Sequence, residues 1–422
     1  MNYCVEYGNR RLAVAVPARR VAGVVAPRSV RPVADVDAAV RRALAGPMGT
    51  PPLAEMLRGK RTALIVTVDT TRPSPRPLLT PVLDECARQG VKPTVIIALG
   101  RHRMMTDAEL KRHLGRDVCS AVKVLQHDAF DRANTVAKGR TKRGTEIRVN
   151  REIFRHDVVI GAGIIEPSYL CGFSGGRKLL MPGLAYHESI DNNHYFLTHP
   201  DTRIGRLDGN PVSEDAEEFA AKLPLHFIVY SVNGPRDEVV QVVAGHPVEA
   251  HRRACERSAR IFTVRPKTAD IVVSSAGGTP YDCDLVQGKK AIVPAMDLVR
   301  RNGVIILCAE CREGLGAEAT FIRWLKTKTP AEVVRDVRDR EQFNLGAHGA
   351  NILARPIVGK NAKIILVTCA RVAAELAGTY LTVVTSLPEA MSLADRLAGC
   401  RSTILFVQNA RRLIVETAGG EA

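Results

Sequence analysis

The sequence predicts an α/β protein of two domains with mostly parallel sheets, and two observations support this prediction. Short apolar runs of strand length alternate with longer segments of helical periodicity, the order typical of βαβ units. The chain has 422 residues, more than one hydrophobic core usually supports, so two domains are expected, with an active site in the cleft between them. We place the boundary near Pro266, which gives domains of residues 1–265 and 266–422, the last residues being free to return to the first domain.

The first βαβ unit begins near Arg61. Its expected elements are a strand, a polar loop, a helix and a second strand, at residues 63–68, 69–77, 78–89 and 94–99. His102 follows the second strand, and then Thr106 and Glu109 form a capping box that opens the next helix. Ligands bind at the carboxyl ends of strands in open parallel sheets, so His102 is a candidate functional residue.

Two later strands also lead into glycine-rich loops. A strand at residues 157–160 precedes residues 172–178, and a strand at 270–274 precedes residues 276–280. The C-terminal half continues the alternation, with strands expected at 303–307, 362–367, 382–384 and 403–406 and helices at 317–324, 330–339 and 387–397. Residues 346–360 fit either a long loop or a helix.

The charge of the chain indicates an anionic ligand. Lys and Arg number 60 against 44 Asp and Glu, for a net charge of +16, and such an excess attracts anions. The basic residues are spread along the whole chain without interleaved aromatic side chains, so a small anionic substrate explains the charge as well as nucleic acid does. We expect no nucleic-acid partner; retention on DNA with a steep salt dependence would support one.

The composition predicts a cytoplasmic protein. Hydrophobic residues make up 45% of the chain and charged residues 25%, which is ordinary for a globular protein. The sequence has no apolar run of about 18 residues and no signal-peptide core near its N-terminus. Its ten cysteines are scattered, unlike a disulfide framework. Reduced thiols and no membrane segment are expected, and an oligomer is compatible with these features.

The glycine-rich loop of residues 172–178 reads Gly-Phe-Ser-Gly-Gly-Arg-Lys. Alone, it fits either a structural turn or a loop whose backbone N–H groups bind a phosphate. It is not a P-loop, because Leu179 follows Lys178 where that motif requires Ser or Thr. Sixteen residues beyond Lys178, His194 lies in a segment dense in polar residues. The loop and this histidine are therefore candidates for one site.

Six motifs, in order along the chain, resemble those of the nickel-dependent lactate racemase family. They are Asp-Thr-Thr-Arg-Pro at residues 69–73, Gly-Arg-His-Arg at 100–103, the glycine-rich loop, Asn-His at 193–194, Gly-Asn-Pro at 209–211, and residues 276–290. The resemblance is strong from Arg61 to Val299 and looser beyond. Each motif alone is weak evidence, whereas six in order are specific.

The resemblance implies a nickel pincer nucleotide as cofactor, a pyridinium mononucleotide whose two sulfurs and one ring carbon bind nickel. Lys178 matches the lysine that tethers this cofactor through a thioamide. His194 matches the remaining nickel ligand, a role that suits neutral imidazole at a square-planar centre. The other residues implied in binding the cofactor are Asp69, Thr71, Ser174, Gly175, Gly176 and Asn210. The enzymes that synthesise the cofactor are implied as partners.

The resemblance also implies a racemase or epimerase, an isomerase that acts on a small anionic 2-hydroxy acid by hydride transfer. His102 matches the base that removes the hydroxyl proton while the Cα hydrogen leaves as hydride. A pKa of about 6.5 lets histidine accept and return a proton near neutral pH. Arg72, Gln287 and Lys290 match the positions that hold the substrate carboxylate.

The chain departs from the family at Ser168, which stands where the second catalytic histidine belongs. Losing one proton-transfer group costs ~10²- to 10⁴-fold in rate, and serine unaided is no base at neutral pH. His187 or Tyr169 could replace it, or the substrate geometry could differ. Val286, where tyrosine is common, also indicates an altered pocket. We predict a 2-hydroxy acid other than lactate; the alternative is a non-catalytic or redox-altered homologue that binds the cofactor or an anionic metabolite.

Overall fold

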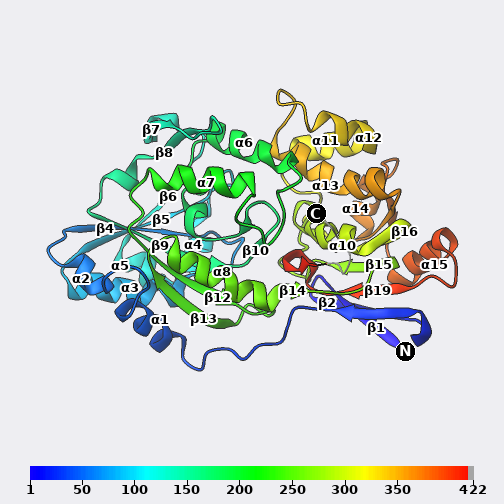
Figure 1. Ribbon diagram of the computed structural model, residues 1–422, viewed down its shortest axis with the longest axis horizontal. Coiled ribbons are helices and arrows are strands. Elements are labelled where there is room, and N and C mark those ends of the chain that lie inside the picture. The colour runs from blue at the N-terminus through cyan, green and yellow to red at the C-terminus, as the bar shows by residue number, and fades with distance from the viewer. Residues whose placement is uncertain (417–422) are drawn as a thin grey trace. The chain divides into compact units, whose positions relative to one another are not determined.

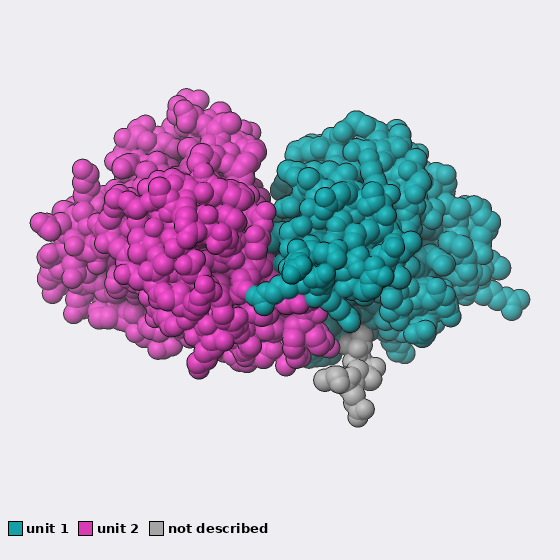
Figure 2. Space-filling model, turned by 90° about the horizontal axis from the view of Figure 1, so that it is seen from above, with its two compact units in different colours: residues 1–28, 262–422 teal, residues 29–261 magenta. Residues whose placement is uncertain are grey.

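The computed structural model describes residues 1–416, and its contacts divide the chain into two compact units (Figure 2). Unit 1 consists of Met1–Arg28 and the chain from Phe262 onward, and unit 2 of Ser29–Ile261. Each unit contains its own six-stranded sheet with mostly parallel neighbours. The predicted α/β class with two domains is thus confirmed.

The sheet of unit 2 has the strand order β13-β12-β9-β4-β5-β6 (Figure 1). In that order the strands span Val239–Gly245, Phe227–Asn233, Val158–Ile165, Thr62–Thr67, Lys92–Ile97 and Lys123–Gln126. All neighbours run parallel except β12 and β13. Both faces of a parallel sheet are covered, so its strands read as nearly continuous apolar runs, and β9 is buried along its whole length.

Helices and short antiparallel pairs surround this sheet. The helices are α1 (Val36–Ala45), α2 (Leu53–Leu57), α3 (Arg76–Arg88), α4 (Asp107–Leu114), α5 (Arg116–Ala121), α6 (His187–Tyr195), α7 (Pro211–Ala221) and α8 (Glu249–Phe262). The pairs are β7 (Thr135–Arg140) with β8 (Glu146–Asn150), and β10 (Pro167–Ser168) with β11 (Gly172–Phe173). Side chains of α1, α2 and α3, including Leu44, Leu53 and Val82, form one core with the sheet.

The predicted first βαβ unit is confirmed. Its elements β4, α3 and β5 span residues 62–67, 76–88 and 92–97, close to the expected 63–68, 78–89 and 94–99. The capping box is also present: Thr106 Oγ1 accepts from Glu109 N at 3.3 Å, and Glu109 Oε2 accepts from Thr106 N at 2.8 Å. These elements follow from local signals alone, which is why the sequence could predict them.

The sheet of unit 1 is entirely parallel and has the order β18-β17-β16-β15-β19-β3. In that order its strands span Thr382–Val384, Lys363–Val367, Val299–Cys308, Ala269–Ser275, Ile404–Val407 and Val21–Val25. The helices are α9 (Leu285–Gly288), α10 (Ile292–Leu298), α11 (Ala319–Thr327), α12 (Pro330–Asp336), α13 (Leu345–Lys360), α14 (Ala370–Glu375) and α15 (Leu387–Ala398). Residues 346–360, which fitted either a loop or a helix in the sequence, form helix α13, and this helix is mostly buried.

The N-terminal segment differs from the prediction, because Met1–Arg28 belongs to unit 1. Strand β3 pairs with β19, and the hairpin of β1 (Asn2–Tyr7) and β2 (Arg10–Ala15) packs on the same sheet. Tyr3 stacks on Phe406 with ring centroids 4.9 Å apart. The described C-terminal end also stays in unit 1, where β20 (Ile414–Val415) pairs with β14 (Thr263–Val264). The chain passes from unit 2 back into unit 1 after Ile261, close to the boundary predicted near Pro266.

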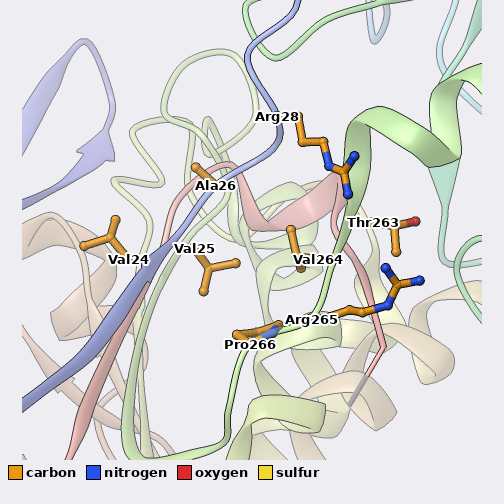
Figure 3. A pocket seen from close by; sticks show the side chains of 8 residues that line it. All are labelled: Val24, Val25, Ala26, Arg28, Thr263, Val264, Arg265 and Pro266. Atoms are coloured by element: carbon orange, nitrogen blue, oxygen red, sulfur yellow. The ribbon is translucent and has the colours of Figure 1, made fainter. Parts of the chain in front are cut away.

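Unit 1 has a hollow of about 350 Å³ beside its edge strand β3 (Figure 3). Its lining residues are Val24, Val25, Ala26, Arg28, Thr263, Val264, Arg265 and Pro266. The candidate site residues are not among them. Within residues 1–416, no helix is both long and apolar enough to cross a membrane.

Candidate active site

The glycine-rich loop takes its shape from backbone conformations and close contacts that require glycine. Gly175 has a φ of +77°, and a Cβ there would lie 2.2 Å from Ile165 Cδ1. Gly172 has a φ of +74°, and a Cβ there would lie 2.0 Å from the carbonyl oxygen of Arg206. Ser174 Oγ donates to the carbonyl oxygen of Ile164 and accepts from Glu166 N, both at 2.9 Å. Packing therefore accounts for these glycines, and the cofactor contacts implied for Ser174, Gly175 and Gly176 stay predictions.

A buried guanidinium fastens this loop to helices α7 and α8. Arg177 Nη2 donates to the carbonyl oxygen of Cys171 and to Ser213 Oγ, both at 2.8 Å. Arg177 Nη1 lies 3.4 Å from Nε2 of His251, and that nitrogen lies 2.9 Å from the carbonyl oxygen of Ser174. Burial, with the charge of Arg177, lowers the pKa of His251 to about 3, so its ring is neutral. Sequence reasoning missed this histidine, because α8 follows the loop by more than seventy residues.

Lys178, the predicted tether, lies in the 3-10 turn Gly176–Leu179 that ends the loop. Burial lowers the pKa of its amine, and the positive charges of Arg72 and Arg177 act in the same direction. A neutral amine is the form that can attack an acyl carbon. The turn therefore presents a lysine suited to forming an amide or thioamide.

His194, the predicted metal ligand, lies on α6 with only 3% of its surface exposed. Its Nδ1 is buried and has no hydrogen-bond partner among residues 1–416. Burial lowers the pKa of His194 to about 3, and the charge of Arg101 acts in the same direction. A neutral imidazole with an unpartnered nitrogen is the form that binds a metal.

Within residues 1–416, no three His, Cys, Asp or Glu side chains gather so that they could hold a metal ion. His194 fits a site in which the protein gives one ligand and a cofactor gives the others. The residues present therefore fit a metal-bearing cofactor held by Lys178 and His194.

A buried carboxylate fixes helix α6 beside α7. Asp215 Oδ2 accepts from Asn193 Nδ2 and from Thr145 Oγ1, both at 2.8 Å. Asp215 Oδ1 accepts from Thr141 Oγ1 at 2.5 Å. This network holds Asn193, the neighbour of His194. Sequence reasoning missed Asp215, although an acidic residue on the apolar face of α7 was a signal that could have revealed it.

Asp69 and His102 form a hydrogen-bonded pair at adjacent strand ends. Asp69 follows β4 and His102 follows β5, and Asp69 Oδ2 lies 2.6 Å from His102 Nδ1. Thr71 Oγ1 donates to Asp69 Oδ1 at 2.5 Å. The carboxylate holds the proton on Nδ1, which leaves Nε2 of a side chain 55% exposed as the proton acceptor. The structure thus brings Asp69, Thr71 and His102 together, and the role of His102 as a general base stays a prediction.

We expect Asp69→Asn to weaken folding in a pH-dependent way. Burial alone would raise the pKa of Asp69, but the hydrogen bonds and charge of His102, with Thr71 and Arg72, hold it well below its usual value. The ionised carboxylate therefore stabilises the fold above the ordinary Asp pKa of about 3.9, and this contribution is lost as the pH falls through the folded pKa.

In chemical denaturation at pH 7, Asp69→Asn should lower the free energy of unfolding by about 1 to 3 kcal/mol. This difference between the variant and the wild type should become smaller below pH 4. Asp84→Asn is the control, because Asp84 forms an exposed ion pair with Arg41 and such pairs contribute about 1 kcal/mol or less. Equal losses in the two variants would contradict the assigned role of Asp69.

Arg72 is held by a buried carboxylate that sequence reasoning did not single out. Arg72 Nε lies 3.0 Å from Glu166 Oε1, and the Glu166 side chain is only 4% exposed. Arg72 Nη1 also donates to the carbonyl oxygen of Thr71 at 2.9 Å. The guanidinium, predicted to hold a substrate carboxylate, is thereby oriented beside the pair of Asp69 and His102.

Ser168 and His187 lie in different surroundings. Ser168 pairs with Gly172 in the short ladder of β10 and β11. His187 opens helix α6, where its ring stacks on Phe130 with centroids 4.9 Å apart and contacts Tyr186 at 4.4 Å. These contacts give His187 a packing role at the start of the helix. Its role as a replacement base stays a prediction.

Asn210 is completely buried and caps helix α7. Its Oδ1 accepts from the backbone N–H groups of Val212 and Ser213, and its Nδ2 donates to the carbonyl oxygen of Arg206 at 3.1 Å. Capping and loop closure account for this residue in the structure. The cofactor contact implied for it stays a prediction.

Gln287 and Lys290 belong to unit 1, whereas the other predicted site residues belong to unit 2. The two are paired, since Lys290 Nζ donates to Gln287 Oε1. Asp284 caps α9 by accepting from Gln287 N at 2.7 Å. The neighbouring Lys289 is buried, and burial lowers its pKa to about 8. Unit 1 thus presents an amide and an ammonium group side by side, and their contact with a substrate carboxylate stays a prediction.

Comparison with known proteins identifies the family. The lactate racemase of Thermoanaerobacterium thermosaccharolyticum is 33% identical over 424 aligned positions, which cover 98% of this chain and 99% of that protein. Family models match residues 7–205 as a lactate racemase N-terminal domain and residues 264–415 as a lactate racemase C-terminal domain. The chain belongs to the lactate racemase family. Lactate racemases are isomerases, the enzyme class predicted from the sequence.

Further members and solved structures agree with this family. The lactate racemase of Lactiplantibacillus plantarum is 30% identical over 298 residues, 69% of this chain and 70% of that protein. The lactate racemase apoprotein of T. thermosaccharolyticum superposes with a TM-score of 0.92, covering 99% of this chain and 100% of that chain. A Thermotoga maritima protein, 20% identical, has a TM-score of 0.69 over 90% of this chain and 98% of its own, which shows the fold alone.

Proposed function

We propose that this member of the family is a racemase or epimerase of a 2-hydroxy acid other than lactate, which acts by reversible hydride transfer with a nickel pincer nucleotide on Lys178. The observation that carries the proposal is the buried, neutral His194, whose Nδ1 has no hydrogen-bond partner among residues 1–416 and whose pKa is lowered by burial. The family relationship supports a nickel-containing cofactor and a small hydroxy acid substrate. A cytoplasmic location and delivery of the cofactor by its synthesis enzymes are part of the same proposal.

Each proposed site residue of unit 2 has its own role in the reaction. When bound, the cofactor supplies an acceptor and donor for hydride. His102 Nε2 takes the substrate hydroxyl proton and returns it, while Asp69 keeps the ring oriented at 2.6 Å. Arg72, held by Glu166, binds the substrate carboxylate through its guanidinium.

Gln287 and Lys290 of unit 1 are the other residues that the family resemblance implies in binding the substrate carboxylate. An amide and an ammonium group beside each other can bind the two oxygens of one carboxylate. Val286, which directly precedes Gln287, is smaller than the tyrosine that is common at this position in the family. A smaller side chain there suits a substrate bulkier than lactate.

A panel of D- and L-2-hydroxy acids tests the proposal. Protein produced together with the cofactor-synthesis enzymes is incubated with each acid, and chiral chromatography measures the conversion of one stereoisomer into the other. We expect one class of acid to be converted faster than lactate. If no acid is converted by protein whose Lys178 carries the cofactor, the racemase proposal is wrong and the non-catalytic alternative holds.

The serine at position 168 favours the non-catalytic alternative, and replacing Ser168 by histidine tests that alternative. We expect Ser168→His to raise lactate racemisation by ~10²-fold or more, because it restores a second proton-transfer group. Ser168→Ala is the matched control, since alanine supplies no base. Equal rates in the two variants would show that the pocket has diverged at more positions than Ser168.

A further inference from the structure

An ion pair joins the two segments that carry the proposed base and the proposed metal ligand. Arg101 directly precedes His102 in the loop after β5, and Asp191 lies one helical turn before His194 on α6. Arg101 Nη1 donates to Asp191 Oδ1. We infer that Arg101 and Asp191 are positioning residues that fix the loop of His102 to the helix of His194. The inference rests on the proposed function and deepens it.

This pair is built into its surroundings, unlike an isolated surface ion pair. The side chains of Arg101 and Asp191 are 26% and 34% exposed. The guanidinium of Arg101 lies 5.7 Å from the ring centroid of Phe130, and His187 stacks on the same ring at 4.9 Å. His187 Nδ1 lies 3.8 Å from Asp191 Oδ2. Packing on the aromatic ring restricts the Arg101 side chain, which lowers the entropic cost of holding it beside Asp191.

The other contacts of the loop hold it to different elements. Gly100 N donates to the carbonyl oxygen of Gly183 at 2.9 Å, and His102 Nδ1 faces Asp69 after β4. These contacts fix the loop to the sheet edge and to the segment that follows Lys178. The pair with Asp191 fixes it to α6. Proton and hydride transfer act on one substrate, and a misplacement of about 1 Å can cost ~10²-fold in rate.

A direct role in binding the substrate anion makes a different kinetic prediction. An arginine that binds the substrate raises KM when it is removed, whereas one that positions the base lowers kcat. The pairing with Asp191 favours positioning, because it ties the guanidinium to α6, the helix that carries His194. The ratio of the effects on kcat and KM therefore distinguishes the two roles.

The test compares Arg101→Gln and Asp191→Asn with the control Arg103→Gln. Arg103 lies in the same loop and pairs with Glu109 at 2.6 Å, but its side chain is 70% exposed. Hydrogen exchange is measured by mass spectrometry on protein without cofactor, and kcat and KM on protein loaded with it. We expect both test variants to exchange faster in residues 98–106 and 187–195 and to lose ~10- to 100-fold in kcat, with KM changed less than about threefold. Arg103→Gln should match the wild type in each measurement.

Two results would overturn the inference. One is hydrogen exchange in Arg101→Gln and Asp191→Asn equal to that of Arg103→Gln. The other is an effect of Arg101→Gln mainly on KM, which would make Arg101 a substrate contact. Failure of the proposed function is visible separately, as wild-type protein without adduct or activity, and the exchange measurements on unloaded protein still decide whether the pair fixes the two segments.

Discussion

Replacing His194 by alanine should remove most of the nickel from protein produced with the cofactor-synthesis enzymes. The buried imidazole is neutral, and its Nδ1 has no hydrogen-bond partner in the part of the chain that the structure describes. We expect the nickel content per chain to fall about tenfold or more, because residues 1–416 contain no group of three His, Cys, Asp or Glu side chains that could hold the metal ion in its place. Racemisation should fall with it. Inductively coupled plasma mass spectrometry gives the nickel content, and intact mass shows whether the adduct on Lys178 is retained.

Two further variants make this result interpretable. His194→Gln keeps a polar side chain of similar size, so it checks that nickel loss does not reflect a collapsed helix α6. His199→Ala removes an exposed histidine that pairs with Asp201 at 3.6 Å just beyond the helix, and its nickel content should equal that of the wild type. Full nickel content in His194→Ala would rule out His194 as the ligand.

Replacing His102 by asparagine should cost ~10²- to 10⁴-fold in kcat, the usual effect of losing a general base. Asparagine can still hydrogen-bond to Asp69 but cannot accept a proton. The adduct on Lys178 should persist, because His102 is assigned no part in the tether. Stereoisomer conversion under saturating substrate measures the loss, and intact mass checks the loading.

Asp69→Asn is the natural comparison for His102→Asn. It leaves the base in place but removes the carboxylate that holds its proton on Nδ1. We expect a smaller loss than in His102→Asn, since a base with the wrong orientation retains part of its function. A wild-type rate in His102→Asn would show that another group, such as His187, takes the substrate proton.

The place of His102 at a strand end could be predicted from local signals in the sequence, whereas Asp69 was singled out by the family resemblance. Apolar runs locate β4 and β5, and neighbouring parallel strands bring Asp69 and His102 to one sheet edge. The partners of Arg72 and Arg177 could not be predicted in this way. Glu166 and His251 reach them through the tertiary fold, and no periodicity or spacing in the sequence relates such residues.

The place of the first 28 residues shows the same limit. Their alternating pattern is that of a hairpin and a strand, and this pattern is equally compatible with either sheet. The structure adds β3 to the edge of the unit 1 sheet beside β19. Strands β3 and β19 are far apart in the sequence. They pair because the N-terminal segment packs on the core of unit 1, in which Tyr7 and Val5 are buried. Sequence order alone therefore assigned this segment to the wrong unit.

The most direct test of the central claim is the intact mass of the wild-type chain produced with the cofactor-synthesis enzymes, together with its nickel content. The account predicts an added mass equal to the pincer nucleotide, located at Lys178 by peptide mapping, and nickel in the same proportion as the adduct. Lys178→Arg, produced in parallel, should show neither. An unmodified Lys178 without nickel in the wild-type protein would contradict the account.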